Sequence, residues 1–354
     1  MSWIRKYRQG QASKMDRRSF LRAAAAGGLG ALFALKAGPL LAQYDDDAAY
    51  YSPLPPPQIT DPKLFIHPKL ASGIRDAVGV RLVCLFDISG SIDSAEYEAQ
   101  LNAMADAIAS QDFRDAVYFT GGPQSVAICV ADFGDNSDLR MPWVDFRKGD
   151  DWKFSLFSDE VRALKRRESG MTGQAKALQY SMVCLQNCPW KAKRSIVDMI
   201  TDGQENVTMN GEEALKLSRE ALGTTYGATV NALITLDSYG ADDFVKWSWA
   251  NLVTQHGFYK SDGSILDPGF VKVVATQQSV KSPGAIVEYY KAMELAFRRK
   301  LILEVAGIEH DELQRRVLAE RKMNGGRLVG QSPSIQPPGI ILPASPHGSP
   351  AIIP

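Results

Sequence analysis

Short hydrophobic runs recur along the middle of this chain, and longer segments with helical periodicity separate them. Four of the runs are almost continuously apolar, which is typical of strands covered on both faces. These runs are Val80–Asp87, Ser125–Phe133, Arg194–Asp202 and Ala228–Leu236. Phe270–Ala275 is a further strand candidate, and the more polar run Asp138–Phe146 predicts a short antiparallel edge strand.

The segments between these runs repeat their apolar residues every three to four positions, as amphipathic helices do. Asp93 and Glu96 can form a capping box at the start of the first helix. The apolar face of that helix carries Tyr97, Leu101, Met104, Ala105 and Ile108. Further helices are expected at Lys153–Arg167, Gln174–Asn187, Glu212–Leu222 and Asp242–Val253, and a last one carries Tyr289, Met293, Phe297 and Leu301.

Alternating strands and helices imply right-handed crossovers between parallel strands. The expected fold class is therefore α/β: a doubly wound, mostly parallel central sheet flanked by helices on both faces, with one short antiparallel edge strand. Ligands bind to such sheets at the carboxyl ends of the strands, near the point where the strand order reverses. Polar residues that follow the strands are thus the first candidates for a functional site.

Composition divides the chain into four regions. Residues 1–42 have the composition of a targeting segment, and residues 43–73 form a linker rich in Pro and Asp. Residues 74–308 hold the folded domain. Residues 309–354 are expected to form a short helix and then a disordered tail rich in Pro and Gly.

The first 42 residues have the order of an export signal. A basic stretch precedes the thirteen weakly apolar residues Ala23–Leu35, which are too few for a bilayer span of about 20 residues but suit a signal peptide. The junction "DRRSFLR" (Asp16–Arg22) resembles a twin-arginine export signal, although an acid precedes the arginine pair. Met1 and Met15 are both candidate starts, and cleavage is expected after Ala42. The alternative is an uncleaved amphipathic helix.

Export by that route implies a protein that resides in the periplasm or otherwise outside the cytoplasm, in an oxidising environment. No transmembrane span is expected in the mature chain. Cys84 and Cys129 lie within strand-like runs and are expected to be buried thiols. Cys184 and Cys188 are four residues apart near a helix end, so a local disulfide and two free thiols both stay open.

Charge argues against nucleic acid as a partner. The chain has 40 basic and 40 acidic residues, but residues 1–42 contain eight of the basic and one of the acidic residues. The rest of the chain is acidic, whereas neutralising phosphates requires clustered Lys and Arg. The basic run Lys165, Arg166 and Arg167 is interpreted as the solvated end of a helix.

Three polar loops follow, or lie near, the expected strand ends: "DISGS" at Asp87–Ser91, "SGMTGQ" at Ser169–Gln174 and "ITDGQEN" at Ile200–Asn206. The candidate ligands in these loops are Asp87, Ser89, Ser91, Thr172 and Asp202. All five offer oxygen, which suits a hard divalent cation such as Mg²⁺, with Mn²⁺ and Ca²⁺ as alternatives. The first motif alone is a common polar turn, so the prediction depends on all three loops.

The same three motifs resemble the metal-ion-dependent adhesion site of von Willebrand factor A-type domains, and the resemblance covers about Val80–Val305. "FDISGSID", "RSIVDMITDG" and "RRKL" are similar to a bacterial group of exported proteins of unknown function built on this domain. The resemblance implies that the two serines and Thr172 contact Mg²⁺ through hydroxyls, and that both aspartates bind it directly or through water. Thr201 stands where that group more often has Gly.

Neutral hydroxyls leave a bound cation electrophilic, so a carboxylate from a partner can replace a bound water. The expected function is an exported protein-binding module that docks a partner's Asp or Glu through Mg²⁺ and is not an enzyme. The alternative is a metal-assisted hydrolase of the cell envelope, for which the sequence indicates no general base. Glu205 and Asn206 are interpreted as solvated loop residues in preference to rim residues of the site.

Overall fold

The computed structural model describes residues 61–71, 77–120, 123–167, 170–208, 210–236, 241–275 and 283–323. The expected export signal, most of the expected linker and the Pro-rich tail lie outside these residues. Within the described ranges, no helix is both long enough and apolar enough to cross a membrane.

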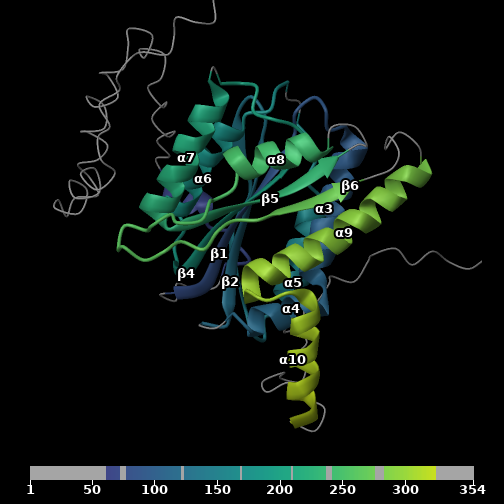
Figure 1. The fold of residues 1–354 in the computed structure, drawn as a ribbon. Coiled ribbons are helices and arrows are strands. Elements are labelled where there is room, and N and C mark those ends of the chain that lie inside the picture. The colour runs from purple at the N-terminus through teal and green to yellow at the C-terminus, as the bar shows by residue number, and fades with distance from the viewer. Residues whose placement is uncertain are drawn as a thin grey trace, which may run out of the picture. The chain divides into compact units, whose positions relative to one another are not determined.

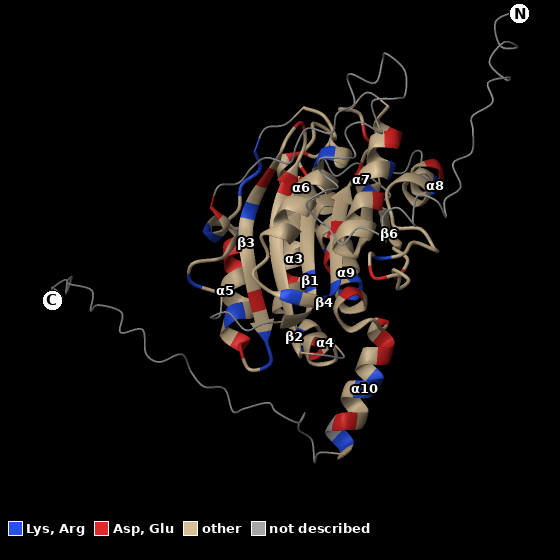
Figure 2. Ribbon diagram, turned by 90° about the vertical axis from the view of Figure 1, so that its left-hand side faces the viewer, with Lys and Arg blue, Asp and Glu red and all other residues tan. Residues whose placement is uncertain are grey.

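The strands of the described chain form one sheet in the order β3–β2–β1–β4–β5–β6 (Figure 1; β3 is labelled in Figure 2). They are β1 Ala77–Asp87, β2 Ser125–Phe133, β3 Ser137–Arg147, β4 Lys191–Thr201, β5 Ala228–Leu236 and β6 Val271–Ala275. Neighbouring strands pair in parallel, except for β2 and the edge strand β3, which pair antiparallel. The prediction of a mostly parallel sheet with an antiparallel edge strand is confirmed.

Helices cover both faces of the sheet, so the fold has three layers (Figure 1). One face carries α3 Ser94–Ala109, α4 Gln111–Tyr118, α5 Asp151–Arg162 and α9 Pro283–Ala306, and the other carries α6 Gln174–Gln186, α7 Gly211–Tyr226 and α8 Ala241–Asn251. A further helix, α10 His310–Met323, follows α9. Leu85 and Phe86 of β1 belong to opposite cores, because successive side chains of a strand point to opposite faces.

The start of α3 confirms the capping box. The side chain of Asp93 accepts hydrogen bonds from the backbone of Ala95 and Glu96, and the side chain of Glu96 accepts one from the backbone of Asp93. The sequence did not predict α4, which begins after Ser110, whose hydroxyl accepts from the backbone of Phe113 at 3.2 Å. With only eight residues, α4 is too short for a clear periodicity.

Residues 61–71 fall within the expected linker, and they are packed against the domain. Phe65, in the short 3₁₀ helix η2 (Pro62–Phe65), is buried. The backbone of His67 donates to the carbonyl of Trp143 in β3 at 3.0 Å, and its Nε2 lies 2.8 Å from a carboxylate oxygen of Glu160 in α5. The described part of this segment therefore extends the folded domain toward the N-terminus.

The four cysteines are free thiols in the structure. Cys84 and Cys129 are buried in the sheet, as predicted, and Cys184 is buried in α6. Because α6 ends at Gln186, Cys188 is not on the same helix face as Cys184. The helical argument for a local disulfide therefore does not apply to this pair.

A buried cluster of charges joins α9 to the sheet. The ammonium group of Lys300 contacts Asp198 of β4 and lies 2.5 Å from Oε1 of Glu304. The side chain of Asn231 in β5 donates to the same Glu304 oxygen at 2.7 Å. Lys300 and Asp198 are fully buried, and burial raises the pKa of Glu304 to about 7. This cluster specifies which face of α9 lies on the sheet.

We expect Lys300→Met to lower the free energy of unfolding by about 3–5 kcal/mol, because two buried carboxyl groups lose their counter-charge. Chemical denaturation followed by circular dichroism measures the change. Arg315→Gln is the control, since Arg315 pairs with Glu312 on an exposed part of α10 and such pairs contribute about 0.2–1 kcal/mol. Equal losses in both variants would contradict the assigned role of Lys300.

Candidate metal site

The candidate site lies where the strand order reverses. Asp87 ends β1, and Asp202 directly follows β4. These two strands are parallel neighbours, with Phe86 paired to Ile200. The next strand after β1 is β2, on one side of this pair, and the next strand after β4 is β5, on the other side. A crevice outside the carboxyl ends of the strands forms at such a switch point. The fold therefore places the two aspartates together at the position expected for a ligand site.

A chain of hydrogen bonds connects loop 1, residues 87–91, to loop 3, residues 202–206. Oδ1 of Asp87 accepts from the backbone N–H of Ser89 at 2.8 Å. The hydroxyls of Ser89 and Ser91 lie 3.1 Å apart, and the Ser91 hydroxyl donates to Oδ1 of Asp202 at 2.8 Å. The structure thus brings four of the five predicted ligands into one continuous polar group.

Loop 2, residues 170–173, brings the fifth residue to the same place. Thr172 is buried, and a Cβ added to Gly203 would lie only 3.3 Å from its hydroxyl oxygen. A side chain beside Asp202 would therefore crowd the Thr172 hydroxyl. The carbonyl of Gly170 also accepts from the backbone of Gly90 at 3.2 Å, which ties loop 2 to loop 1.

Two carboxylates lie close together in this group. Burial raises the pKa of Asp87 to about 6, and the charge of Asp202 raises it in the same direction, while hydrogen bonds from Ser89 and Thr201 lower it. The hydroxyl of Thr201 donates to Oδ2 of Asp87 at 2.7 Å. Thr201, which appeared in the sequence only as a departure from a motif, therefore holds the deepest carboxylate of the site.

Asn206 is an exposed loop residue, as expected, and Glu205 is a partly exposed one, but both also bind backbone groups near Thr172, which the sequence did not indicate. The backbone of Thr172 donates to Oδ1 of Asn206 at 2.7 Å and accepts from its backbone at 3.0 Å. Oε2 of Glu205 accepts from the backbone of Ala175 at 2.6 Å, so it caps α6, whose own N-cap residue makes no side-chain hydrogen bond. Both residues fix the backbone around Thr172, and only the folded chain shows this.

Two further side chains support the loops. Asp135, between β2 and β3, accepts from the backbone of Gly170 at 3.2 Å and of Met171 at 3.1 Å. Gln174 is buried at the start of α6 and donates to the carbonyl of Gly203 at 2.8 Å. Loops 2 and 3 are therefore held by side chains from other parts of the chain.

The sequence suggested that the basic run Lys165–Arg167 ends a helix. This prediction is wrong, because α5 ends at Arg162. The guanidinium of Arg166 instead donates to the carbonyls of Ile88 and Ser89 in loop 1, at 2.9 and 3.0 Å. Lys165 and Arg167 are exposed. In the view of Figure 2, acidic and basic residues are interspersed along the helices and strands.

The donors of this site fit a hard divalent cation. They are two carboxylates and three hydroxyls, and they include neither nitrogen nor sulfur. In the described part of the chain, no three His, Cys, Asp or Glu side chains are grouped so that they could hold a metal. A metal at this site would therefore depend on the hydroxyls, and a +2 charge would offset the repulsion between Asp87 and Asp202. The role of the five residues as metal ligands stays a prediction.

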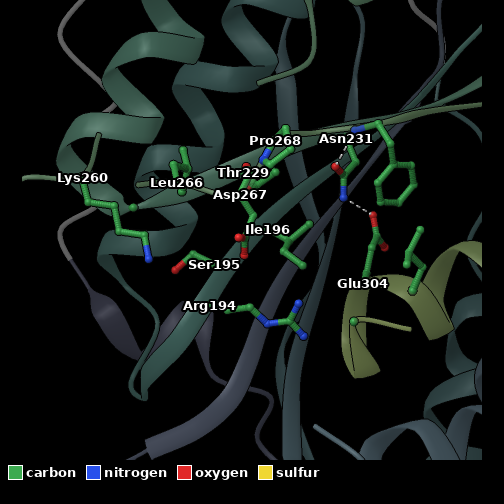
Figure 3. A pocket seen from close by; sticks show the side chains of 14 residues that line it. Arg194, Ser195, Ile196, Thr229, Asn231, Lys260, Leu266, Asp267, Pro268 and Glu304 are labelled. Carbon is green, nitrogen blue, oxygen red and sulfur yellow. Dashed lines mark hydrogen bonds between the residues drawn. The ribbon is translucent and has the colours of Figure 1, made fainter. Parts of the chain in front are cut away.

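A cavity of about 290 Å³ lies toward the opposite end of the strands, near the amino ends of β4 and β5 (Figure 3). Its lining includes Arg194, Thr229, Asn231, Asp267 and Glu304. Glu304 and Asn231 belong to the buried charge cluster, and the hydrogen bond between them is visible in Figure 3. The cavity is therefore separate from the candidate metal site.

Similar solved structures include a von Willebrand factor type A protein from Catenulispora acidiphila, at 15% identity and a TM-score of 0.39, covering 65% of this chain and 47% of that one. Proximal thread matrix protein 1 from the mussel byssus matches at 15% identity and a TM-score of 0.37, covering 64% and 47%. The PilB minor pilin from Streptococcus sanguinis matches at 11% identity and a TM-score of 0.39, covering 66% and 64%. This chain spans about half the length of the first two proteins.

No curated protein matches the sequence. A family model described as "Protein of unknown function (DUF1194)" matches residues 77–309. The match begins with β1 and ends after α9, so it includes the whole sheet and all three loops of the candidate site. The chain belongs to this family of proteins of unknown function, DUF1194.

Proposed function

We propose that this protein is an exported protein-binding module that docks an acidic residue of a partner through a divalent cation, with Mg²⁺ the first choice. The observation that carries the proposal is the continuous polar group from Asp87 through Ser89 and Ser91 to Asp202, at the switch point of the sheet. Its three loops converge although more than a hundred residues separate Ser91 from Asp202.

Asp87, Ser89, Ser91, Thr172 and Asp202 are the residues that would hold the cation. When bound there, the cation supplies a positively charged centre that accepts a carboxylate oxygen. The protein's own residues orient the hydroxyls and keep Asp87 away from solvent. Ser91 and Asp202 are less buried than Asp87 and Ser89, so a partner approaches from their side.

The proposal includes no catalytic step. Two of the histidines contact carboxylates away from the site: His67 contacts Glu160 of α5, and His310 contacts Asp112 of α4. Export is part of the proposal because residues 1–42 resemble a twin-arginine signal. These residues lie outside the described structure.

Mg²⁺ is expected to raise the melting temperature of the wild-type protein. At a concentration one hundred times the dissociation constant, a ligand of the folded state adds about 2.7 kcal/mol. Asp202→Asn removes a charged ligand and should abolish the shift. Asp138→Asn is the matched control, because Asp138 is an exposed carboxylate paired with Arg167. Thermal denaturation with Mg²⁺ and with EDTA tests this, and a shift that persists in Asp202→Asn would exclude the site.

Without metal, Asp87→Asn should stabilise the protein at pH 7 by on the order of 3 kcal/mol. The pKa of Asp87 is raised in the folded state to about 6 from an ordinary 3.8, so the wild type loses stability as the pH rises from about 4 to about 6. The variant has no carboxyl group at this position and avoids that loss.

The difference between Asp87→Asn and the wild type should vanish near pH 3.5, and Mg²⁺ should stabilise only the wild type. Urea denaturation across this pH range with EDTA present measures the difference, with Asp138→Asn again as the control. A metal-free variant that is less stable than the wild type at pH 7 would show that the ionised Asp87 carboxylate does not destabilise the folded state.

Docking predicts a requirement for an acidic residue in the partner. Peptides displayed on phage and selected on the Mg²⁺-loaded protein, then eluted with EDTA, should share an Asp or Glu. Changing that residue to Asn or Gln should weaken binding at least tenfold in fluorescence polarisation. Peptides that bind equally well in EDTA, or that bind Asp202→Asn, would contradict metal-mediated docking.

A further inference from the structure

A short irregular segment lies against the candidate metal site. This basic segment, residues 164–167, connects the end of α5 to the residues before loop 2. Arg166 is only partly exposed, and its Nη2 group donates to the carbonyl of Ile88 at 2.9 Å and to the carbonyl of Ser89 at 3.0 Å. A single side chain therefore holds two consecutive peptide groups of loop 1.

The basic segment is itself attached to the sheet. Arg140 of β3 donates from Nη2 to the carbonyl of Lys165 at 2.7 Å, one residue before Arg166. The other end of the Arg140 guanidinium pairs with Asp132 of β2, whose carboxylate is buried and also accepts from the hydroxyl of Tyr97 at 2.7 Å. A series of contacts thus runs from Asp132 through Arg140 and the basic segment to loop 1.

These bonds act on the part of loop 1 that carries a predicted ligand. The two carbonyls belong to the peptide groups on either side of Ser89, so fixing them sets the direction of the Ser89 side chain. Hydrogen bonds to a charged donor stabilise by about 1.5–3 kcal/mol. β1 ends at Asp87, and beyond it the N–H of Ile88 still donates to Phe133 of β2 at 2.8 Å, while the carbonyl of Ser89 also accepts from the backbone of Ile92 at 3.1 Å within the loop.

The charge of Arg166 acts in the opposite direction. A guanidinium close to a cation site repels the cation, and this repulsion alone would weaken metal binding. A Lys ammonium has the same charge and could donate to both carbonyls, as the single Nη2 atom of Arg166 does, but it lacks the rigid planar guanidinium that orients the donor. The value of Arg166 to the site is therefore geometric.

We infer that Arg166 is a positioning residue for the metal site, which holds loop 1 in its ligand-bearing conformation and is anchored by Arg140. The inference rests on the proposed metal-binding function. Residues that orient metal ligands typically change affinity by 10- to 100-fold when they are replaced.

The test compares Arg166→Gln with Arg167→Gln in the metal-free and Mg²⁺-loaded protein. Both variants remove one positive charge from the basic segment, but the side chain of Arg167 pairs with the exposed Asp138 and not with loop 1 in the described structure. We expect Arg166→Gln to weaken Mg²⁺ binding at least tenfold by isothermal titration calorimetry, and Arg167→Gln to change it less than twofold. Arg166→Lys should recover part of the affinity.

A second readout needs no metal. Hydrogen exchange of the amides of residues 88–92 should be faster in metal-free Arg166→Gln than in the wild type, with Arg167→Gln unchanged. Equal effects of the two glutamine variants on Mg²⁺ affinity would show that Arg166 acts only through its positive charge, and would overturn the inference. A lower melting temperature of Arg166→Gln with unchanged affinity would make its role purely structural and overturn it too.

The two proposals can fail separately. A wild-type protein that binds no Mg²⁺ overturns the proposed function, and the exchange rates of loop 1 then still decide whether Arg166 holds the loop. A wild type that binds Mg²⁺ while Arg166→Gln binds it equally well overturns only the role of Arg166.

Discussion

The approach of a half-buried carboxylate to a fully buried one is the constraint on which the rest of this site depends. Asp87 is completely buried at the end of β1, and Asp202 lies one residue beyond the end of the neighbouring β4. Burial and mutual repulsion both favour the protonated form of Asp87. The hydroxyls of Thr201 and Ser91 each donate to one of the carboxylates, which offsets part of the cost. A divalent cation bound as proposed would offset the remainder.

The loops that carry this centre are held by side chains, because a chain that leaves a sheet loses its regular backbone partners. Asn206 bonds both backbone groups of Thr172, Glu205 caps α6, and Asp135 holds Gly170. Arg166 does the same for loop 1 from the outside. Glu205 and Asn206 belong to the connection after β4, whereas Asp135 and Arg166 come from two other connections. The rigidity of the site is therefore a property of the assembled loops and of no single motif.

The two ends of the strands are built differently. At the carboxyl ends, polar groups face outward and three loops meet. Toward the amino ends, Lys300, Asp198 and Glu304 are buried between α9 and the strands, next to a cavity. Buried charges of this kind stabilise little compared with apolar packing, but they tolerate few alternative arrangements. They explain how a long helix with apolar residues on several sides takes one orientation against the sheet.

The order and type of most elements followed from the sequence alone, because strands buried on both faces, such as Ser125–Phe133 and Ala228–Leu236, have nearly continuous apolar runs. The five candidate ligands could also be named, since each follows a strand or precedes a helix within a short motif. The roles of Thr201, Glu205 and Arg166 could not, and neither could the cluster around Lys300. Each of these side chains has a partner far away in the sequence, such as Ile88 for Arg166, 78 residues apart. Local patterns record which residues are buried or turn the chain, whereas only the tertiary structure decides which distant groups meet.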